Sequence, residues 1–118
     1  MKRTLAVILS AGLLGLSSLA ILWPQSPVVV TITNQSNRSI ASIRVEHEQG
    51  IELLEHIGQR ESKTVRLEAR GETSYKLVVR FVDGSEMSGG GGYAEAGYEF
   101  SETILESGID TNVRLPRY

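Results

Sequence analysis

The chain has 118 residues and a formal net charge of −2, with 41% hydrophobic and 22% charged residues. That length allows one domain of ordinary size and excludes a multidomain enzyme. The absence of cysteine excludes disulfide bonds, thiolate metal sites and a cysteine nucleophile. The slightly acidic charge argues against a broad surface for phosphate backbones, so we expect no nucleic-acid partner.

The N-terminal segment differs in kind from the rest of the chain. Lys2 and Arg3 are followed by an uncharged, mainly apolar stretch from Thr4 to Trp23. A helix of about 20 residues spans about 30 Å, the thickness of the hydrocarbon core of a bilayer. Basic residues that flank such a helix stay in the cytoplasm. Residues 1–23 therefore predict a single-pass anchor in a bacterial inner membrane, with the C-terminal domain in the periplasm.

A cleaved signal peptide is the alternative for residues 1–23. The apolar stretch Leu5–Leu16 is followed by Ser18 and Ala20, which satisfy the small-x-small pattern of a cleavage site. The mature chain would then be soluble in the periplasm or secreted. Both interpretations make residues 24–27, which contain two prolines, a linker and residues 28–118 an exported domain. An exported domain without cysteine fits a bacterial envelope better than a small secreted animal domain, which usually needs disulfide bonds.

The exported domain is predicted to consist of strands. Residues 28–33 are a β-branched run, and apolar and polar residues alternate over 41–46, 64–69, 75–82 and 109–115. Asp83-Gly84 predicts a tight hairpin. Tyr98, Phe100 and Ile104 continue an apolar face that Glu102 interrupts. Residues 51–57 fit the helical and strand periods equally well, and we interpret them as a strand or irregular edge.

About seven short strands separated by turns predict an all-β antiparallel sandwich after one N-terminal hydrophobic helix. Residues 71–79 (GETSYKLVV) resemble the beginning of the sixth strand of fibronectin type III and related immunoglobulin-like domains. That resemblance implies that the hydroxyl of Tyr75 hydrogen-bonds back to the preceding corner. Residues 30–45 are similar to the opening hairpin of bacterial immunoglobulin-like adhesion and scaffold modules. Because 35 residues follow Asp83, we expect an added hairpin or a different strand order.

The run Ser88-Gly89-Gly90-Gly91-Gly92-Tyr93 is the most unusual stretch of the chain. A phosphate-binding loop would need a helix N-terminus and usually a lysine, and neither pattern follows it. One interpretation is a flexible or bulged connection between strands. The other is a binding surface, because tyrosine offers a large amphipathic contact area at low entropic cost. The predicted binding residues are Tyr93, Gly90, Gly91, Gly92 and Glu95.

The two histidines carry a weaker, alternative prediction of a metal site. His47 lies between two glutamates, and His56 follows a third. Zinc needs at least three ligands, and in a strand His47 points away from both its neighbours. A solvated acidic edge that prevents aggregation is the preferred interpretation. We expect no metal, no cofactor and, without a recognisable nucleophile elbow, no enzyme activity.

Together these features predict an exported or membrane-anchored bacterial envelope protein. As the immunoglobulin-like resemblance implies, its sandwich would act as a protein–protein interaction or scaffold module. The partner would be another envelope protein, contacted through the region around Tyr93 or by strand addition at an exposed edge. The alternatives are an inhibitor or immunity-type protein that blocks a periplasmic enzyme, and a periplasmic module that binds a small ligand or metal.

Overall fold

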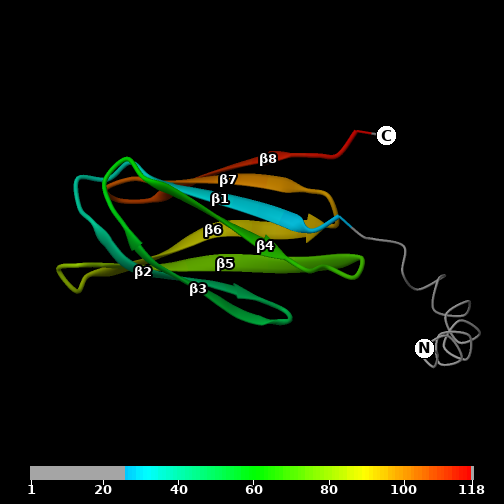
Figure 1. Ribbon diagram of the computed structural model, residues 1–118, viewed down its shortest axis with the longest axis horizontal. Helices are drawn as coiled ribbons and strands as arrows, with labels where there is room; N and C mark the ends of the chain where they lie inside the picture. Colours follow the sequence, from blue (N-terminus) through cyan, green and yellow to red (C-terminus); the bar gives the residue numbers. More distant parts are fainter. Residues whose placement is uncertain (1–25, 118) are drawn as a thin grey trace, which may run out of the picture.

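The computed structural model describes residues 26–117, which form two stacked sheets of four strands each (Figure 1). The first sheet has the strand order β4-β1-β7-β8, and the second has the order β3-β2-β5-β6. The strands are β1 Val28–Asn34, β2 Ile40–His47, β3 Gly50–Ile57, β4 Ser62–Leu67, β5 Glu72–Phe81, β6 Glu86–Glu95, β7 Glu99–Ile104 and β8 Ile109–Arg114. The predicted anchor or signal peptide lies outside the described residues. Between residues 26 and 117 there is no helix long and apolar enough to cross a membrane.

The all-β sandwich is confirmed, whereas the predicted seven antiparallel strands require correction. The structure has eight strands, because the segment after Asp83 forms β6, β7 and β8. One sheet is mixed: β1 pairs antiparallel with β4 but parallel with β7. Since β1 and β7 are far apart in the chain, no tight hairpin forces them to run antiparallel. The ambiguous residues 51–57 belong to β3, an edge strand that pairs with β2.

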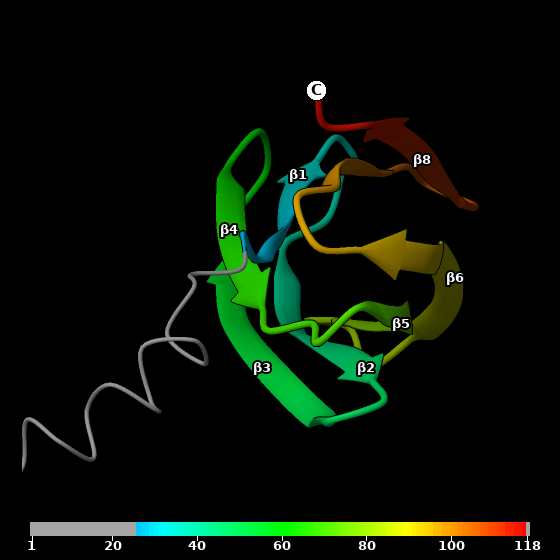
Figure 2. The same cartoon turned by 90° about the vertical axis from the view of Figure 1, so that its right-hand side faces the viewer.

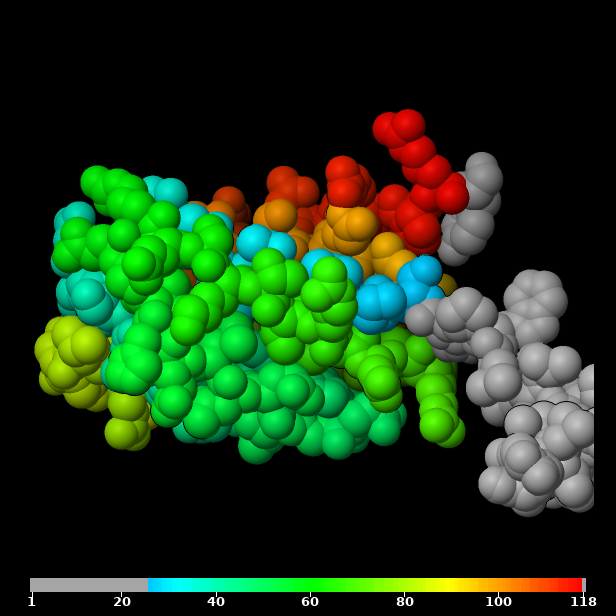
Figure 3. Space-filling view, in the orientation of Figure 1, coloured from blue at the N-terminus to red at the C-terminus, as the bar shows by residue number. Residues whose placement is uncertain are grey.

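The hydrophobic core fills the space between the two sheets. Residues on β1 and β5 alternate between buried and more exposed positions, as expected for strands with one face on a core. Each large aliphatic or aromatic side chain that is fully buried contributes about 1.5–3 kcal/mol. The largest such side chains are Phe81, Ile32, Ile40, Ile43, Ile57, Leu67, Leu77 and Ile104. On one side of the molecule the edge strands β3 and β4 run next to each other, and their side chains form a continuous cover (Figure 3).

The connections gather at the two ends of the sandwich. The β1–β2, β3–β4, β5–β6 and β7–β8 loops lie at one end, which we call the loop end (Figure 1). The other connections lie at the end where the chain enters β1 and leaves β8, which we call the terminal end (Figure 2). There the N–H of Gly97 donates to the carbonyl of Pro27 at 3.2 Å. The β6–β7 turn is therefore fixed against the segment that precedes β1.

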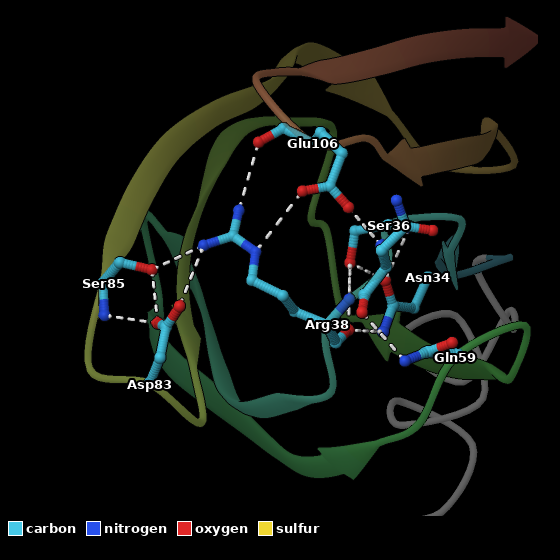
Figure 4. Close-up of polar contacts among 8 residues, drawn as sticks. Asn34, Ser36, Arg38, Gln59, Asp83, Ser85 and Glu106 are labelled. Carbon is cyan, nitrogen blue, oxygen red and sulfur yellow. Dashed lines mark hydrogen bonds and ion pairs between the residues drawn. The ribbon is translucent and has the colours of Figure 1, made fainter.

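Arg38 joins three of the connections at the loop end (Figure 4). Its guanidinium carbon lies 3.7 Å from the centroid of the Phe81 ring. Nη1 donates to Ser85 Oγ at 2.7 Å and lies 3.3 Å from the Asp83 carboxylate, and Nη2 donates to the carbonyl of Glu106 at 3.1 Å. Hydrogen bonds from Ser85, and to a lesser extent Arg38, lower the pKa of Asp83. The β1–β2, β5–β6 and β7–β8 loops thus share one cationic side chain.

We expect Arg38→Ala to lower the free energy of unfolding by about 2 kcal/mol, because it removes a cation–π contact and several charge-assisted hydrogen bonds. Arg80→Ala is the matched control, since Arg80 forms a solvent-exposed pair with Glu86 at 2.8 Å. Removing an exposed pair of this kind should cost less than about 1 kcal/mol. Urea denaturation of the full-length chain measures both. Equal losses in the two variants would contradict the joining role of Arg38.

Candidate functional site

The glycine run lies inside strand β6, so the predicted bulge is present, but it interrupts one strand and does not connect two. Opposite it, Tyr75 of β5 pairs with Gly92, and Leu77 pairs with Gly89. Two residues of β6, Gly90 and Gly91, therefore face the single residue between Tyr75 and Leu77. This arrangement is a β-bulge, in which one extra residue kinks the strand and shifts its register.

Close packing explains why the bulge consists of glycine. Gly90 and Gly91 have φ angles of +70° and +73°, in the left-handed region that favours glycine. A Cβ atom on Gly91 would overlap the carbonyl group of Tyr75, with only 2.7 Å to its carbon. A Cβ atom on Gly90 would lie 2.8 Å from Oε1 of Glu102. Gly92, in contrast, has open space where its Cβ would be. Side chains are thus excluded at two positions of the run.

The bulge decides which way Tyr93 points. Because of the extra residue, Tyr93 pairs with the exposed Ser74, and Ala94 pairs with the buried Thr73. Successive residues of a strand point to opposite faces of the sheet. A register shifted by one residue would therefore turn Tyr93 inward and Ala94 outward. Without the bulge, Tyr93 would lie opposite Thr73 and point into the core. The glycine run therefore places the ring of Tyr93, 51% exposed, on the surface.

Beneath the bulge lies the carboxylate of Glu102, the residue that interrupts the apolar face of Tyr98, Phe100 and Ile104. Glu102 on β7 is only 1% exposed. Its carboxylate accepts hydrogen bonds from the hydroxyl of Tyr75, from the N–H of Gly91 at 2.8 Å and from the hydroxyl of Thr111 at 2.6 Å. We call these four residues the buried carboxylate cluster. It links β5 and β6 of one sheet to β7 and β8 of the other, and both oxygens of the carboxylate have donors.

Tyr75 has a different partner from the one implied by the immunoglobulin-like resemblance. Its hydroxyl donates across the sandwich to Glu102 rather than to the preceding corner. Burial raises the pKa of Tyr75 far above 10, and the hydrogen bond to the Glu102 carboxylate and its negative charge raise the pKa further. The folded protein therefore holds this phenol in its neutral form.

This raised pKa predicts a loss of stability in alkali. The unfolded chain ionises Tyr75 near pH 10, whereas the folded chain does not, so the stabilising effect is complete below pH 10. Above that pH the free energy of unfolding should fall by about 1.4 kcal/mol per pH unit from this group. We expect Tyr75→Phe to be less stable at neutral pH but to decline less steeply above pH 10. Denaturant unfolding of wild type and Tyr75→Phe at a series of pH values tests this. Parallel declines in wild type and Tyr75→Phe would contradict the assignment.

A row of aromatic rings leads from the buried carboxylate cluster to the surface. The ring centroids of Tyr75 and Phe100 are 5.0 Å apart, with an interplanar angle of 88°. Phe100 and Tyr98 follow at 6.3 Å, and Tyr98 and Tyr93 at 6.4 Å with an angle of 79°. The edge-to-face contacts of Tyr75 with Phe100 and of Tyr98 with Tyr93 are favourable for aromatic pairs. The exposed ring of Tyr93 is thus supported from the core by packed rings.

Two glutamates complete the surroundings of Tyr93. Its hydroxyl donates to the carboxylate of Glu95 and lies 3.4 Å from the carboxylate of Glu72. The hydrogen bond to Glu95 is the main cause of a raised pKa of Tyr93, and the charges of both glutamates add to it. We call Tyr93, Tyr98, Glu72 and Glu95 the tyrosine patch; it lies where β5 begins and β6 ends. Of the predicted binding residues, Tyr93 and Glu95 meet here. Gly91 belongs instead to the buried carboxylate cluster, Gly90 lies against Glu102, and Gly92 has open space beside it.

The two histidines of the alternative metal site have separate surroundings. Nε2 of His47 lies 3.2 Å from a carboxylate oxygen of Glu52, and Nδ1 accepts from the N–H of Gln49 at 3.2 Å. His56 is exposed on β3 and has a left-handed φ of 60°. In the part of the chain that the structure describes, no three His, Cys, Asp or Glu side chains are grouped so that they could hold a metal ion.

Comparisons with known proteins support the fold. No protein-family model matches the chain, and no curated protein matches it. Among solved structures, the chain is similar to a protein from Eubacterium rectale determined by NMR, with 17% sequence identity and a TM-score of 0.57. The match covers 79% of this chain and 91% of the other. At this identity the likeness shows a shared β-sandwich fold.

Proposed function

We propose that this chain is an exported bacterial envelope protein whose sandwich is a protein–protein interaction or scaffold module, and that the tyrosine patch is its contact surface. The observation that carries the proposal is the half-exposed ring of Tyr93, which is supported from the core by the packed rings of Tyr98 and Phe100. An aromatic side chain held in place loses little conformational entropy when it binds, and tyrosines of this kind dominate many protein interfaces.

Features of the sequence support the cellular setting of the proposal. The uncharged stretch from Thr4 to Trp23 favours export or membrane anchoring, and an exported domain without cysteine favours a bacterial envelope. The similarity of residues 30–45 to the opening hairpin of bacterial immunoglobulin-like adhesion and scaffold modules favours an adhesion or scaffold role. An inhibitor of a periplasmic enzyme is a special case of the same class.

The placement of the patch adds a geometric expectation. The tyrosine patch lies at the terminal end, where the β6–β7 turn contacts Pro27. With residues 4–23 as a membrane anchor, the patch would lie near the bilayer. The partner would then be a membrane protein or the part of a periplasmic protein close to the membrane.

Photo-crosslinking in living cells tests the proposal. A photoreactive amino acid is placed at Tyr93 of the full-length chain, and the adducts are identified by mass spectrometry. We expect one dominant adduct with an envelope protein. A probe at Arg66, which is exposed on β4, is the matched control and should not give this adduct. No specific adduct, or the same adducts from both positions, would contradict the proposal.

A further inference from the structure

We infer that the tyrosine patch recognises a basic segment of the partner protein, with an arginine or lysine side chain stacked on the ring of Tyr93. The inference rests on the proposed function and specifies the chemistry of the partner. It follows from the placement of two carboxylates, from the exposed aromatic surface beside them, and from a similar arrangement elsewhere in the chain.

The charges of the patch are not balanced within the described residues. Glu72 and Glu95 lie directly opposite each other in the antiparallel pair of β5 and β6. Like charges in this position repel each other and destabilise the pair of strands. Throughout residues 26–117, no lysine or arginine lies within ion-pair distance of either carboxylate. A cationic side chain of the partner would relieve this repulsion.

The aromatic surface lies beside these carboxylates. The hydroxyl of Tyr93 contacts both glutamates, so its ring is next to them, and Tyr98 packs against it edge to face. The face of an aromatic ring attracts cations, and the attraction is strongest when water is excluded. A cation stacked on Tyr93 would have the carboxylates of Glu72 and Glu95 beside the same ring. Arginine suits the patch best, because its planar guanidinium stacks on a ring and hydrogen-bonds at its edge at once.

The chain binds one of its own arginines in this way. At the loop end the guanidinium of Arg38 lies over the Phe81 ring. The carboxylates of Asp83 and Glu106 lie 3.3 and 3.5 Å from its nitrogens (Figure 4). The tyrosine patch offers the same kinds of groups, an aromatic ring and two carboxylates, without the arginine. The overall charge of the domain also favours a basic partner. Residues 24–118 contain ten lysines and arginines and fourteen acidic residues. A negatively charged protein attracts a positively charged partner over a distance.

A peptide titration tests the inference on the full-length chain in micelles of a neutral detergent. The probe is a blocked tetra-arginine peptide, followed by nitrogen–proton NMR, and a blocked tetra-glutamate peptide is the ligand control. We expect saturable shift changes centred on β5 and β6 around Tyr93. Affinity should fall at least tenfold in Tyr93→Ala and several-fold in Glu95→Gln, and Tyr93→Phe should keep most of it. Glu86→Gln is the matched control on β6, because Glu86 already pairs with Arg80, and it should bind as wild type does.

Several results would overturn the inference. One is equal affinity for the peptide in wild type, Tyr93→Ala and Glu95→Gln. Another is NMR shift changes spread over all acidic residues. A third is shift changes at the patch with calcium chloride but not with the peptide.

Failure of the inference can be distinguished from failure of the proposed function. A specific adduct at Tyr93 without patch-dependent peptide binding rejects only the basic segment. Peptide binding at the patch without a specific adduct in cells rejects the proposed contact surface.

Discussion

Gly91→Ala should lower the free energy of unfolding by at least about 3 kcal/mol, because the new Cβ atom overlaps main-chain atoms that cannot move independently of the sheet. That atom would lie 2.7 Å from the carbonyl carbon of Tyr75, and the φ of +73° adds strain for any residue with a side chain. Relief would require β6 to move away from β5. Such a movement would lengthen the hydrogen bond from Gly91 to Glu102.

Gly92→Ala is the matched control for this effect. Gly92 belongs to the same run and also has a positive φ, +134°, but no atom lies within 4 Å of its Cβ position. Its substitution should therefore show backbone strain alone, about 1–3 kcal/mol. Urea denaturation of the full-length variants provides the comparison. If the two substitutions cost the same, the close approach of Tyr75 is not what requires glycine at position 91.

The second large effect is expected at Glu102. Glu102→Ala leaves the hydroxyl of Tyr75 and the N–H of Gly91 buried without an acceptor, which should cost about 3–5 kcal/mol in unfolding free energy. Glu102→Gln should cost only about 1–2 kcal/mol, since its carbonyl oxygen can accept from both donors. Its amide can donate to the hydroxyl of Thr111, which rotates to accept.

The comparison of these two variants separates hydrogen bonding from charge. Denaturant unfolding at neutral pH gives both free energies. A small loss in Glu102→Gln beside a large loss in Glu102→Ala supports a carboxylate that works as a hydrogen-bond acceptor. Equal and large losses would show that the negative charge itself is needed in the cluster. A small loss in Glu102→Ala would contradict the linking role altogether.

The strands were predictable from sequence because apolar alternation reports local burial. The Asp83-Gly84 hairpin between β5 and β6 and the β-branched strand β1 are both present. The parallel pairing of β1 with β7 was not predictable. Alternation shows which side chains face the core, but it does not show the direction of a neighbouring strand.

The bulge shows why the site was only partly predictable. Counting along β5 and β6 from the observed pair of Arg80 and Glu86 places Tyr93 opposite Thr73, on the inward face. The observed pairing of Tyr93 with Ser74 depends on one extra residue at Gly90-Gly91. The sequence marks the place with glycines but does not give the size of the shift. Glu95 was expected near Tyr93, whereas Glu72 joins the patch only through the shifted register.

The sequence around Glu102 contains one sign of the buried carboxylate cluster. Glu102 interrupts an apolar face at an inward position between Phe100 and Ile104. A carboxylate at such a position needs buried donors. Its donors come from β5, β6 and β8, and Tyr75 lies 27 residues away in the chain. Only the stacking of the two sheets brings these groups together. The cluster therefore could not be predicted from the sequence.

Photo-crosslinking from position 93 in living cells shows whether the glycine bulge presents Tyr93 to a partner protein. The most informative form compares the probe at position 93 with the probe at position 66, each in the full-length chain. We expect one dominant adduct with an envelope protein from position 93 alone. The absence of any adduct specific to position 93 would contradict it and leave the bulge with a purely structural role.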